Sequence, residues 1–79
     1  MVHFVYLLRC CDGEYYTGIS ENLRRRIEEH QNGESKSTVH RLPIKLIWFA
    51  AFTNNHLAAK FEKYLKSHSG TAFMRKRIF

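Results

Sequence analysis

Near its start the chain carries two short segments rich in β-branched, aromatic and aliphatic residues, with the turn-forming pair Asp12-Gly13 between them. Residues 3–10 and 14–19 have the composition of the two strands of a β-hairpin. An Asp-Gly pair suits a two-residue loop, and a three-residue loop over residues 11–13, with Gly13 left-handed, is equally available. A hairpin of either kind commits this part of the chain to an antiparallel sheet.

The length of this loop decides which side chains share a face of the sheet, because successive strand residues point to opposite faces. With two loop residues, Tyr6 and Tyr16 lie on opposite faces. With three, Leu8 opposes Tyr16 and Tyr6 opposes Gly18, so both tyrosines lie on one face. The hairpin residues alone leave both registers open.

Capping residues indicate the next elements. Ser20 can cap a helix over about residues 21–31, and Asn32-Gly33 can end it. Residues 34–42 are polar and rich in Ser, Thr and His, which is typical of a mobile loop.

The second half of the chain predicts another strand and a longer helix. Pro43 opens a strand over residues 44–52, which alternates early and is continuously apolar late. Asn54-Asn55 can cap a helix over about residues 56–67. Its expected buried stripe consists of Leu57, Phe61, Tyr64 and Leu65.

A short basic helix over residues 72–78 finishes the chain after a break at residues 69–71, which gives the order β-β-α-β-α-α. A strand that is apolar on both faces must be covered on both faces, so helices are expected to flank the sheet. The prediction is an α+β fold, an α/β sandwich, in a single domain over residues 1–79.

Composition excludes several classes of protein. No apolar stretch approaches the ~20 residues that a membrane helix needs, and the first residues lack the pattern of a signal peptide. Cys10 and Cys11 are adjacent and do not readily bridge each other, which fits a reduced, cytoplasmic protein. No Cys or His pair has the spacing of a zinc site.

Charge is distributed unevenly along the chain. Thirteen Lys and Arg residues against seven Asp and Glu give a formal net charge of +6. Only one of the seven acidic residues, Glu62, follows Glu34, whereas nine of the thirteen basic residues do. This asymmetry favours a polyanionic partner, most simply nucleic acid, over a basic surface that serves solubility alone.

Arg26 and His30 stand out on the first predicted helix. The two preceding arginines each have a glutamate four residues on and are expected to form ordinary surface pairs. Arg26 has His30 at that position instead, and it lies with Leu23 and Ile27 on a stripe that borders the buried face. An arginine there either lays its stem across the core edge, with its head in water, or has a function.

Glu62 is the second unusual residue, because it is a lone carboxylate in a cationic half of the chain. It could pair with a neighbouring lysine such as Lys66. It could instead hold a divalent cation near a phosphate group. The residue alone leaves both interpretations open.

Four features then occur in order: Val5-Tyr6-Leu7, Tyr16-Thr17-Gly18 ten residues later, Asn22-Leu23-x-x-Arg26-Ile27-x-x-His30, and Ala59-x-x-Glu62-x-x-Leu65-Lys66. Together they resemble the GIY-YIG nuclease domain, and the chain is most similar to the small stand-alone members labelled UPF0213. The resemblance covers essentially the whole chain. Phe4 and Thr17 depart from the family's glycine and isoleucine, at positions that pack within strands.

The resemblance implies a three-stranded antiparallel sheet with flanking helices. It also implies hydrolysis of a DNA phosphodiester with one divalent metal ion, usually magnesium, and no small-molecule cofactor. Matching the motifs residue by residue, the candidate catalytic groups are Tyr6, Tyr16, Arg26, His30 and Glu62. Because such a site needs both tyrosines on one face, the resemblance predicts the three-residue loop.

Each of these residues has an expected role. Arg26 would donate two parallel hydrogen bonds to the phosphate, and Glu62 would hold the metal ion that stabilises the leaving group. Tyr6 is assigned to orient or activate the attacking water, assisted by Tyr16 or His30. A tyrosine has a pKa near 10, so Arg26 would have to lower the pKa of Tyr6 for this role. The candidate substrate contacts are Gly18, Lys45, Lys66, Arg75 and Lys76.

The motifs, the charge and the resemblance lead to three hypotheses about function. The first is a metal-dependent endonuclease acting on DNA, with branched, damaged or single-stranded DNA as candidate substrates and without a further domain for sequence-specific recognition. The second is a nucleic-acid-binding module that keeps the fold and cuts weakly or not at all, held by counterion release. The third is an interaction domain whose partner is a protein. The oligomeric state and the choice between DNA and RNA stay open.

Overall fold

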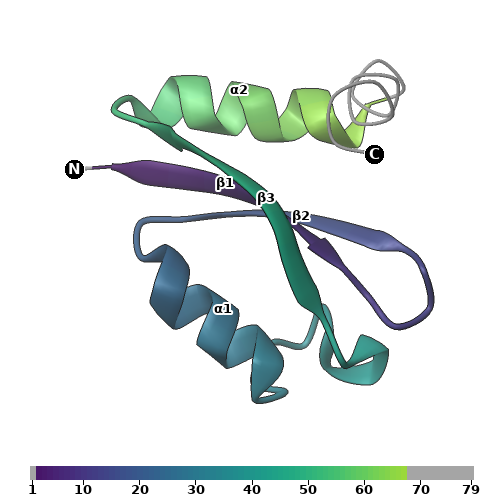
Figure 1. Cartoon of the computed structure of the whole chain (residues 1–79). Helices are drawn as coiled ribbons and strands as arrows, with labels where there is room; N and C mark the ends of the chain where they lie inside the picture. Colours follow the sequence, from purple (N-terminus) through teal and green to yellow (C-terminus); the bar gives the residue numbers. More distant parts are fainter. Residues whose placement is uncertain (1, 68–79) are drawn as a thin grey trace.

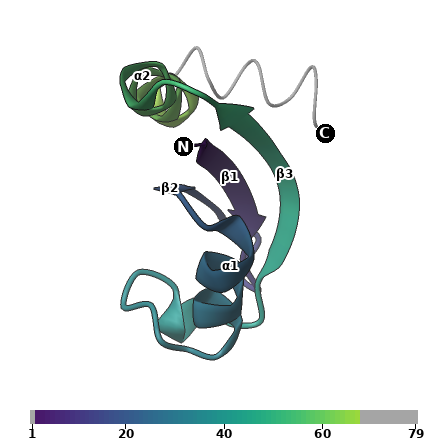
Figure 2. The ribbon, with the colours of Figure 1, turned by 90° about the vertical axis from the view of Figure 1, so that its left-hand side faces the viewer.

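The computed structural model of the chain describes residues 2–67 and contains a single antiparallel sheet. Its strands are β1 (His3–Arg9), β2 (Tyr15–Ser20) and β3 (Lys45–Phe52), in the order β2-β1-β3. The helices α1 (Leu23–Gln31) and α2 (Asn55–Lys66) lie on opposite sides of this sheet (Figures 1 and 2). The predicted α+β class with a helix-flanked three-stranded sheet is therefore confirmed.

The β1–β2 hairpin uses the three-residue loop. The Cys10 amide donates to the Glu14 carbonyl at 2.8 Å, which leaves residues 11–13 as the turn. Gly13 has a φ of 83°, and its amide donates to the Cys10 carbonyl at 3.0 Å. The resulting register pairs Leu8 with Tyr16, as the motif resemblance predicts.

Helix α1 begins two residues later than the sequence predicts. Ser20 is the last residue of β2, so Asn22 acts as the N-cap, and its side chain accepts a hydrogen bond from the Arg25 amide at 3.1 Å. The Ser20 hydroxyl instead accepts from the Asn22 amide at 3.1 Å and tightens the link between strand and helix. Asn32 and Gly33 end the helix as predicted, with Gly33 at a φ of 76°.

The polar segment 34–42 is packed against the domain, so the prediction of a mobile loop is wrong. It contains a short 3₁₀-helix, η1 (Val39–Arg41), and two of its hydroxyl residues, Ser35 and Thr38, are buried. The Arg41 guanidinium pairs with Asp12 in the hairpin turn at 3.2 Å. The segment is held because its polar groups find partners inside the protein.

The strand covered on both faces is β1 rather than β3. Residues 5–8 at the centre of β1 are all buried, whereas β3 is an edge strand with Phe49 51% exposed. The register shifts between Leu7 and Leu8, which places Ile47 as an extra residue on β3. This bulge explains the loss of alternation, because Ile47 and Trp48 both pack against the core on the α2 side.

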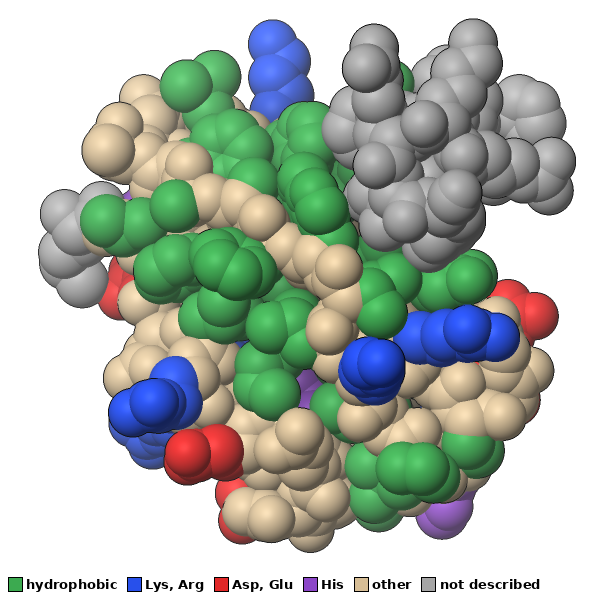
Figure 3. Space-filling view, viewed as in Figure 1, with side chains coloured by type: hydrophobic (Ala, Val, Ile, Leu, Met, Phe, Trp, Pro, Cys, Tyr) green, Lys and Arg blue, Asp and Glu red, His purple; other side chains and the backbone are tan. Residues whose placement is uncertain are grey.

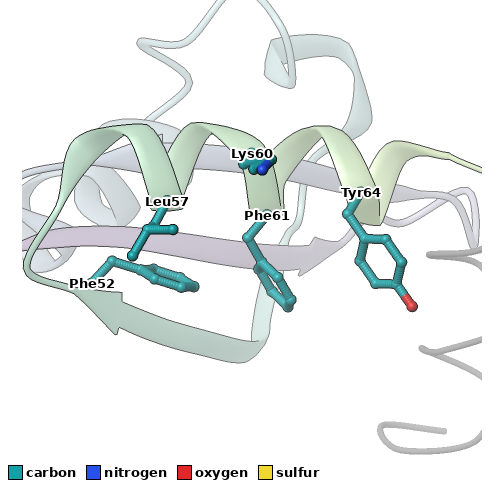
Figure 4. Close-up of a pocket in the computed structure, with 5 residues that line it drawn as sticks. All are labelled: Phe52, Leu57, Lys60, Phe61 and Tyr64. Carbon is teal, nitrogen blue, oxygen red and sulfur yellow. The ribbon is translucent and has the colours of Figure 1, made fainter.

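Helix α2 buries a narrower stripe than predicted. Asn54 caps it by accepting from the His56 and Leu57 amides, but Leu57 is 55% exposed and Tyr64 40% exposed. They line a surface pocket of about 300 Å³ with Phe52, Lys60 and Phe61 (Figure 4). The residues that α2 buries are Ala58 and Leu65.

The surface around β3 is partly apolar. Figure 3, viewed as Figure 1, shows hydrophobic side chains gathered over β3, with Lys and Arg side chains around them. No helix of the described part is long and apolar enough to cross a membrane. The predicted helix over residues 72–78, with Arg75 and Lys76, lies outside the described residues.

The hairpin turn supplies a first test. A Cβ at Gly13 would meet nothing within 4 Å, so Gly13→Ala acts only through the left-handed backbone and should cost about 1–2 kcal/mol. Gly13→Asn should cost less, because asparagine tolerates that conformation. Urea unfolding of both variants measures the difference. Equal costs would contradict a turn that depends on a left-handed residue.

Candidate functional site

Two tyrosines and a histidine form the centre of the site, on the face of the sheet that α1 covers. Tyr6 and Tyr16 lie on this face with ring centroids 6.4 Å apart. The His30 ring makes edge contacts with both, at 5.8 Å from Tyr6 and 5.3 Å from Tyr16. Tyr6 is only 1% exposed, whereas Tyr16 on the edge strand is half-buried. The two phenols therefore differ in their access to solvent.

Gly18 provides the space that Tyr6 occupies. A Cβ at this position would overlap the ring and the hydroxyl of Tyr6. Gly18 is itself buried, and in the structure it has a packing role; its substrate contact stays a prediction. Glycine is required here because the ring lies directly against the backbone of β2.

His30 is fully buried and uses both ring nitrogens. Nε2 lies 3.0 Å from the Tyr6 hydroxyl, and Nδ1 lies 2.7 Å from the Thr38 hydroxyl. Burial, and then the nearby Arg26 guanidinium, lower the pKa of His30, because both disfavour the charged imidazolium. At neutral pH the ring is therefore uncharged, with one N–H donor and one acceptor nitrogen.

Arg26 lies one helical turn before His30 with its guanidinium beside the Tyr6 hydroxyl. Nη1 donates to Glu29 Oε1 at 3.0 Å, and Nη2 donates to Ser35 Oγ at 3.4 Å. The expectation that Arg26 lacks an acidic partner on its helix is wrong, because Glu29 reaches it from position i+3. The hydrogen bond to Glu29 raises the pKa of Arg26, and the same bond lowers the pKa of Glu29.

Glu62 approaches from α2, on the other side of the sheet from Arg26. Its side chain is 20% exposed and its Oε2 lies 3.4 Å from Lys66 Nζ, so the predicted lysine pair forms. Its charge nevertheless reaches Tyr6. Burial raises the pKa of Tyr6 from its usual value near 10, the neighbouring Arg26 guanidinium opposes this, and Tyr16 and then Glu62 add smaller increases. Tyr6 therefore keeps its proton at neutral pH.

Two shallow hollows adjoin the site along β2. The first, of about 370 Å³, is lined at the start of α1 by Arg25, Arg26 and Glu29. The second, of about 280 Å³, lies between β2 and α2 and reaches Ala59, one helical turn before Glu62. Both are also lined by Ser20 and Glu21. Arg26 thus opens onto the surface rather than into an enclosed cavity.

A metal ion held by several protein groups does not fit this site. Within residues 2–67 no group of three or more His, Cys, Asp or Glu side chains could hold a metal ion. One carboxylate, Glu62, does fit magnesium, which keeps several of its waters and binds through one or two carboxylates plus substrate phosphates.

The other predicted substrate contacts are spread out. Lys45 is the first residue of β3 and lies opposite Arg9, at the end of the sheet away from His3. Lys66 pairs with Glu62. The four motifs do not include the side chains that hold Arg26 and His30, namely Glu29, Ser35 and Thr38. The run of hydroxyl residues directly after α1 is the signal that could have indicated them.

Known proteins resemble this chain throughout its length. Residues 2–77 match the family model described as the GIY-YIG catalytic domain. A UPF0213 protein of Clostridium perfringens is 42% identical over 66 residues, which cover 82% of this chain and 71% of the relative. A UPF0213 protein of Haloquadratum walsbyi is 37% identical over 68 residues, which cover 85% of this chain and 76% of the relative.

A solved structure also resembles the fold. The solution NMR structure of the UPF0213 protein BH0048 from Bacillus halodurans superposes with a TM-score of 0.61 at 34% identity. The likeness covers 96% of this chain and 84% of that chain. Sequence and fold comparisons together confirm the resemblance indicated by the four motifs.

The contact between Gly18 and Tyr6 predicts a destabilising substitution. Gly18→Ala should lower the free energy of unfolding by about 1–3 kcal/mol, because the added methyl displaces the Tyr6 ring. Urea denaturation measures this loss, and near-UV circular dichroism reports the change around the tyrosines. A variant as stable as the parent, with an unchanged spectrum, would contradict the packing described.

The lowered pKa of His30 predicts a pH-dependent stability. The unfolded chain takes up a proton at His30 near pH 6.5, while the folded chain resists it, so stability should fall as pH drops below about 6.5. One proton gives at most about 1.4 kcal/mol per pH unit. Urea unfolding between pH 7.5 and 5.5 should show a shallower slope for His30→Gln than for the parent. His56→Gln, at an exposed position, is the control and should keep the parental slope.

Proposed function

Because the chain belongs to the GIY-YIG catalytic-domain family, we propose that it is a metal-dependent endonuclease that hydrolyses phosphodiester bonds in DNA. The observation that carries the proposal is the meeting of Arg26 with Tyr6 and His30, beside the half-exposed Tyr16 and within electrostatic reach of Glu62. The net charge of +6 supports a polyanionic substrate.

Arg26 is the group that we assign to the phosphate. Its side chain is 33% exposed, so a substrate can reach it, while Glu29 and Ser35 hold the guanidinium in one orientation. A planar guanidinium donates paired hydrogen bonds to phosphate oxygens. Held in advance, it stabilises the negative charge that grows on those oxygens as the water attacks.

We assign the water to Tyr16 rather than to Tyr6. The water must lose a proton as its oxygen bonds to phosphorus, so the assisting group needs access to solvent. Tyr6 is buried, contacts His30 and has a raised pKa, which argues against the role first assigned to it. Tyr16 lies on the same face of the sheet and is half-buried. Tyr6 then serves to orient Arg26 and His30.

Glu62 is the residue that would hold the metal ion, and we propose magnesium because a single carboxylate suits it. When bound, such an ion neutralises charge on the phosphate and on the leaving oxygen. Glu62 contributes a carboxylate that is 20% exposed, and its ion pair with Lys66 restrains its orientation. One carboxylate oxygen, Oε1, has no part in that ion pair and is available for another contact.

The alternative is a nucleic-acid-binding module that does not cut. The ion pairs Arg26–Glu29 and Glu62–Lys66 favour it, because each candidate charge already has a partner of opposite sign within its own helix. Such a module would bind DNA through its basic residues, and its affinity would fall steeply with salt.

A cleavage assay separates the two functions. The purified protein is incubated with single-stranded, duplex and branched DNA, with and without magnesium, beside Arg26→Ala and Glu62→Gln. Each substitution should lower the cleavage rate at least about a hundredfold, because each removes a group that stabilises transition-state charge. Arg24→Ala and Glu28→Gln make the same chemical changes at exposed positions of α1 and should cut like the parent.

Three results would contradict the nuclease. Cutting that persists equally in Arg26→Ala and Glu62→Gln would come from a contaminant. Cutting that does not require a divalent ion would contradict a metal-dependent reaction and the proposed role of Glu62 in holding that ion. Equal, salt-dependent binding by the parent and both variants, without a product, would establish the binding module instead.

A further inference from the structure

The phosphate in the proposed reaction must reach groups from both sides of the sheet. Arg26 comes from α1, and Glu62 comes from α2 on the opposite side. Figure 2 shows these two helices on either side of β2, which is an edge strand. A phosphate that contacts both Arg26 and a metal ion on Glu62 therefore lies at the free edge of β2, and the DNA strand that carries it crosses this edge.

The two hollows along β2 meet at this edge. The one at the start of α1 is lined in part by Arg26, and the one between β2 and α2 reaches Ala59, three residues before Glu62. Residues three apart on a helix are neighbours on one face, so Glu62 lies on the flank of α2 that borders the second hollow. Ser20 and Glu21 line both hollows. A nucleotide next to a phosphate at Arg26 thus lies at the second hollow.

The lining of the second hollow suits an uncharged ligand. Among the described residues it includes one carboxylate, Glu21, and no Lys or Arg, so a phosphate there would meet a like charge. Ile19 and Ala59 supply apolar contact, and Ser20 and Asn55 supply hydrogen-bonding groups. A nucleoside has the matching character, because its base combines apolar faces with a polar edge.

The Glu21 carboxylate favours a base that is not paired. Its side chain is 56% exposed and lies 3.8 Å from His3 Nδ1 at the border of the hollow. An ionised carboxylate only accepts hydrogen bonds, and bases carry amino and ring N–H donors along their pairing edge. In a duplex these donors are already paired with the opposite strand, whereas an unpaired base can direct them to Glu21.

We propose that the hollow between β2 and α2 is a subsite for one unpaired nucleoside of DNA, next to the phosphate that Arg26 binds. The inference rests on the proposed function for the position of that phosphate. It narrows the substrate class to DNA with unpaired bases, either single-stranded or branched. Binding in the subsite does not require cutting.

NMR tests the subsite in the absence of cleavage. In ¹⁵N-labelled protein with EDTA, the dinucleotide d(CpC) should shift the amide signals of Asn55 and Ala59 together with that of Arg26. Inorganic phosphate should shift Arg26 and leave Asn55 and Ala59 unchanged, because it has no base to place in the hollow. Equal shifts from both ligands, or no shift at Asn55 and Ala59, would overturn the inference.

Ala59→Met fills the hollow from α2. It should weaken the binding of d(CpC) at least about fivefold, the lower end of what contact with one base contributes. Methionine is a good helix former and the position is exposed, so the fold should persist. Ala51→Met makes the same change at an exposed position of β3 that lines neither hollow, and it should bind like the parent.

A folded Ala59→Met that binds d(CpC) as tightly as the parent would contradict the subsite. If Ala59→Met does not fold, Ile19→Ala gives the decision, because it removes apolar contact from the β2 wall of the same hollow. Ile19→Ala should also weaken d(CpC), and unchanged binding would count against the subsite.

Salt dependence separates contact with a base from contact with a phosphate. For a single-stranded oligonucleotide in EDTA, Arg26→Ala should reduce the slope of log K against log[salt] by about 0.7, the value for one phosphate. Ala59→Met should weaken binding at every salt concentration and keep the parental slope. A slope reduced as much as in Arg26→Ala would mean that the hollow binds phosphate, against the proposal.

Cleavage kinetics separate this inference from the proposed function. Ala59→Met should raise KM for single-stranded DNA at least about fivefold, with a smaller change in kcat. If the parent binds d(CpC) through Asn55 and Ala59 but never cuts DNA, the nuclease fails and the subsite stands. If the parent cuts and Ala59→Met keeps the parental KM, the subsite fails and the nuclease stands.

Discussion

The register of the β1–β2 hairpin is the constraint on which the whole site depends. The left-handed Gly13 allows a three-residue turn, and that turn puts Tyr6 opposite Gly18 and Leu8 opposite Tyr16. A slip of one residue would turn Tyr16 to the α2 face, because strand side chains alternate. It would also remove Gly18 from beneath the Tyr6 ring, where a side chain would collide.

The second organising feature is a continuous set of buried polar contacts. They run from Tyr6 to His30 and from His30 to Thr38, and the Arg26 guanidinium lies beside them. Within residues 2–67 no buried side-chain nitrogen or oxygen lacks a partner. An unpaired member would cost about 1–3 kcal/mol, so these contacts restrain one another. Hydrogen bonds to Glu29 and Ser35 hold the neighbouring guanidinium in a defined orientation.

Tyr6 and Tyr16 are similar side chains with different positions in the fold. Tyr6, on the central strand, is covered by α1 and serves as an internal hydrogen-bonding link. Tyr16, on an edge strand, has the same ring and the same neighbour, His30, yet retains exposed surface. Their motifs look equivalent in the sequence, and only strand order distinguishes them.

Several elements could be predicted because they depend on local preferences. The hairpin, the Asn54 cap and the end of α1 at Asn32-Gly33 follow from turn and capping chemistry within a few residues. Other expectations failed where distant contacts prevail. The 34–42 segment looked mobile because it is polar, but its hydroxyls find partners on α1. The strand expected to be covered on both faces was β3, but the central strand is β1, because apolar content does not reveal the order of strands in a sheet.

The sequence by itself determined the family, the candidate residues at their motif spacings and the helices that carry them. Motif spacing and local backbone preference depend only on residues that are near one another in the sequence. Only the tertiary structure decided that Glu29 holds Arg26, that Tyr6 is buried while Tyr16 is not, and that Thr38 faces His30. The physical reason is that burial, pKa and hydrogen-bond partnership depend on neighbours that the fold brings from elsewhere in the chain.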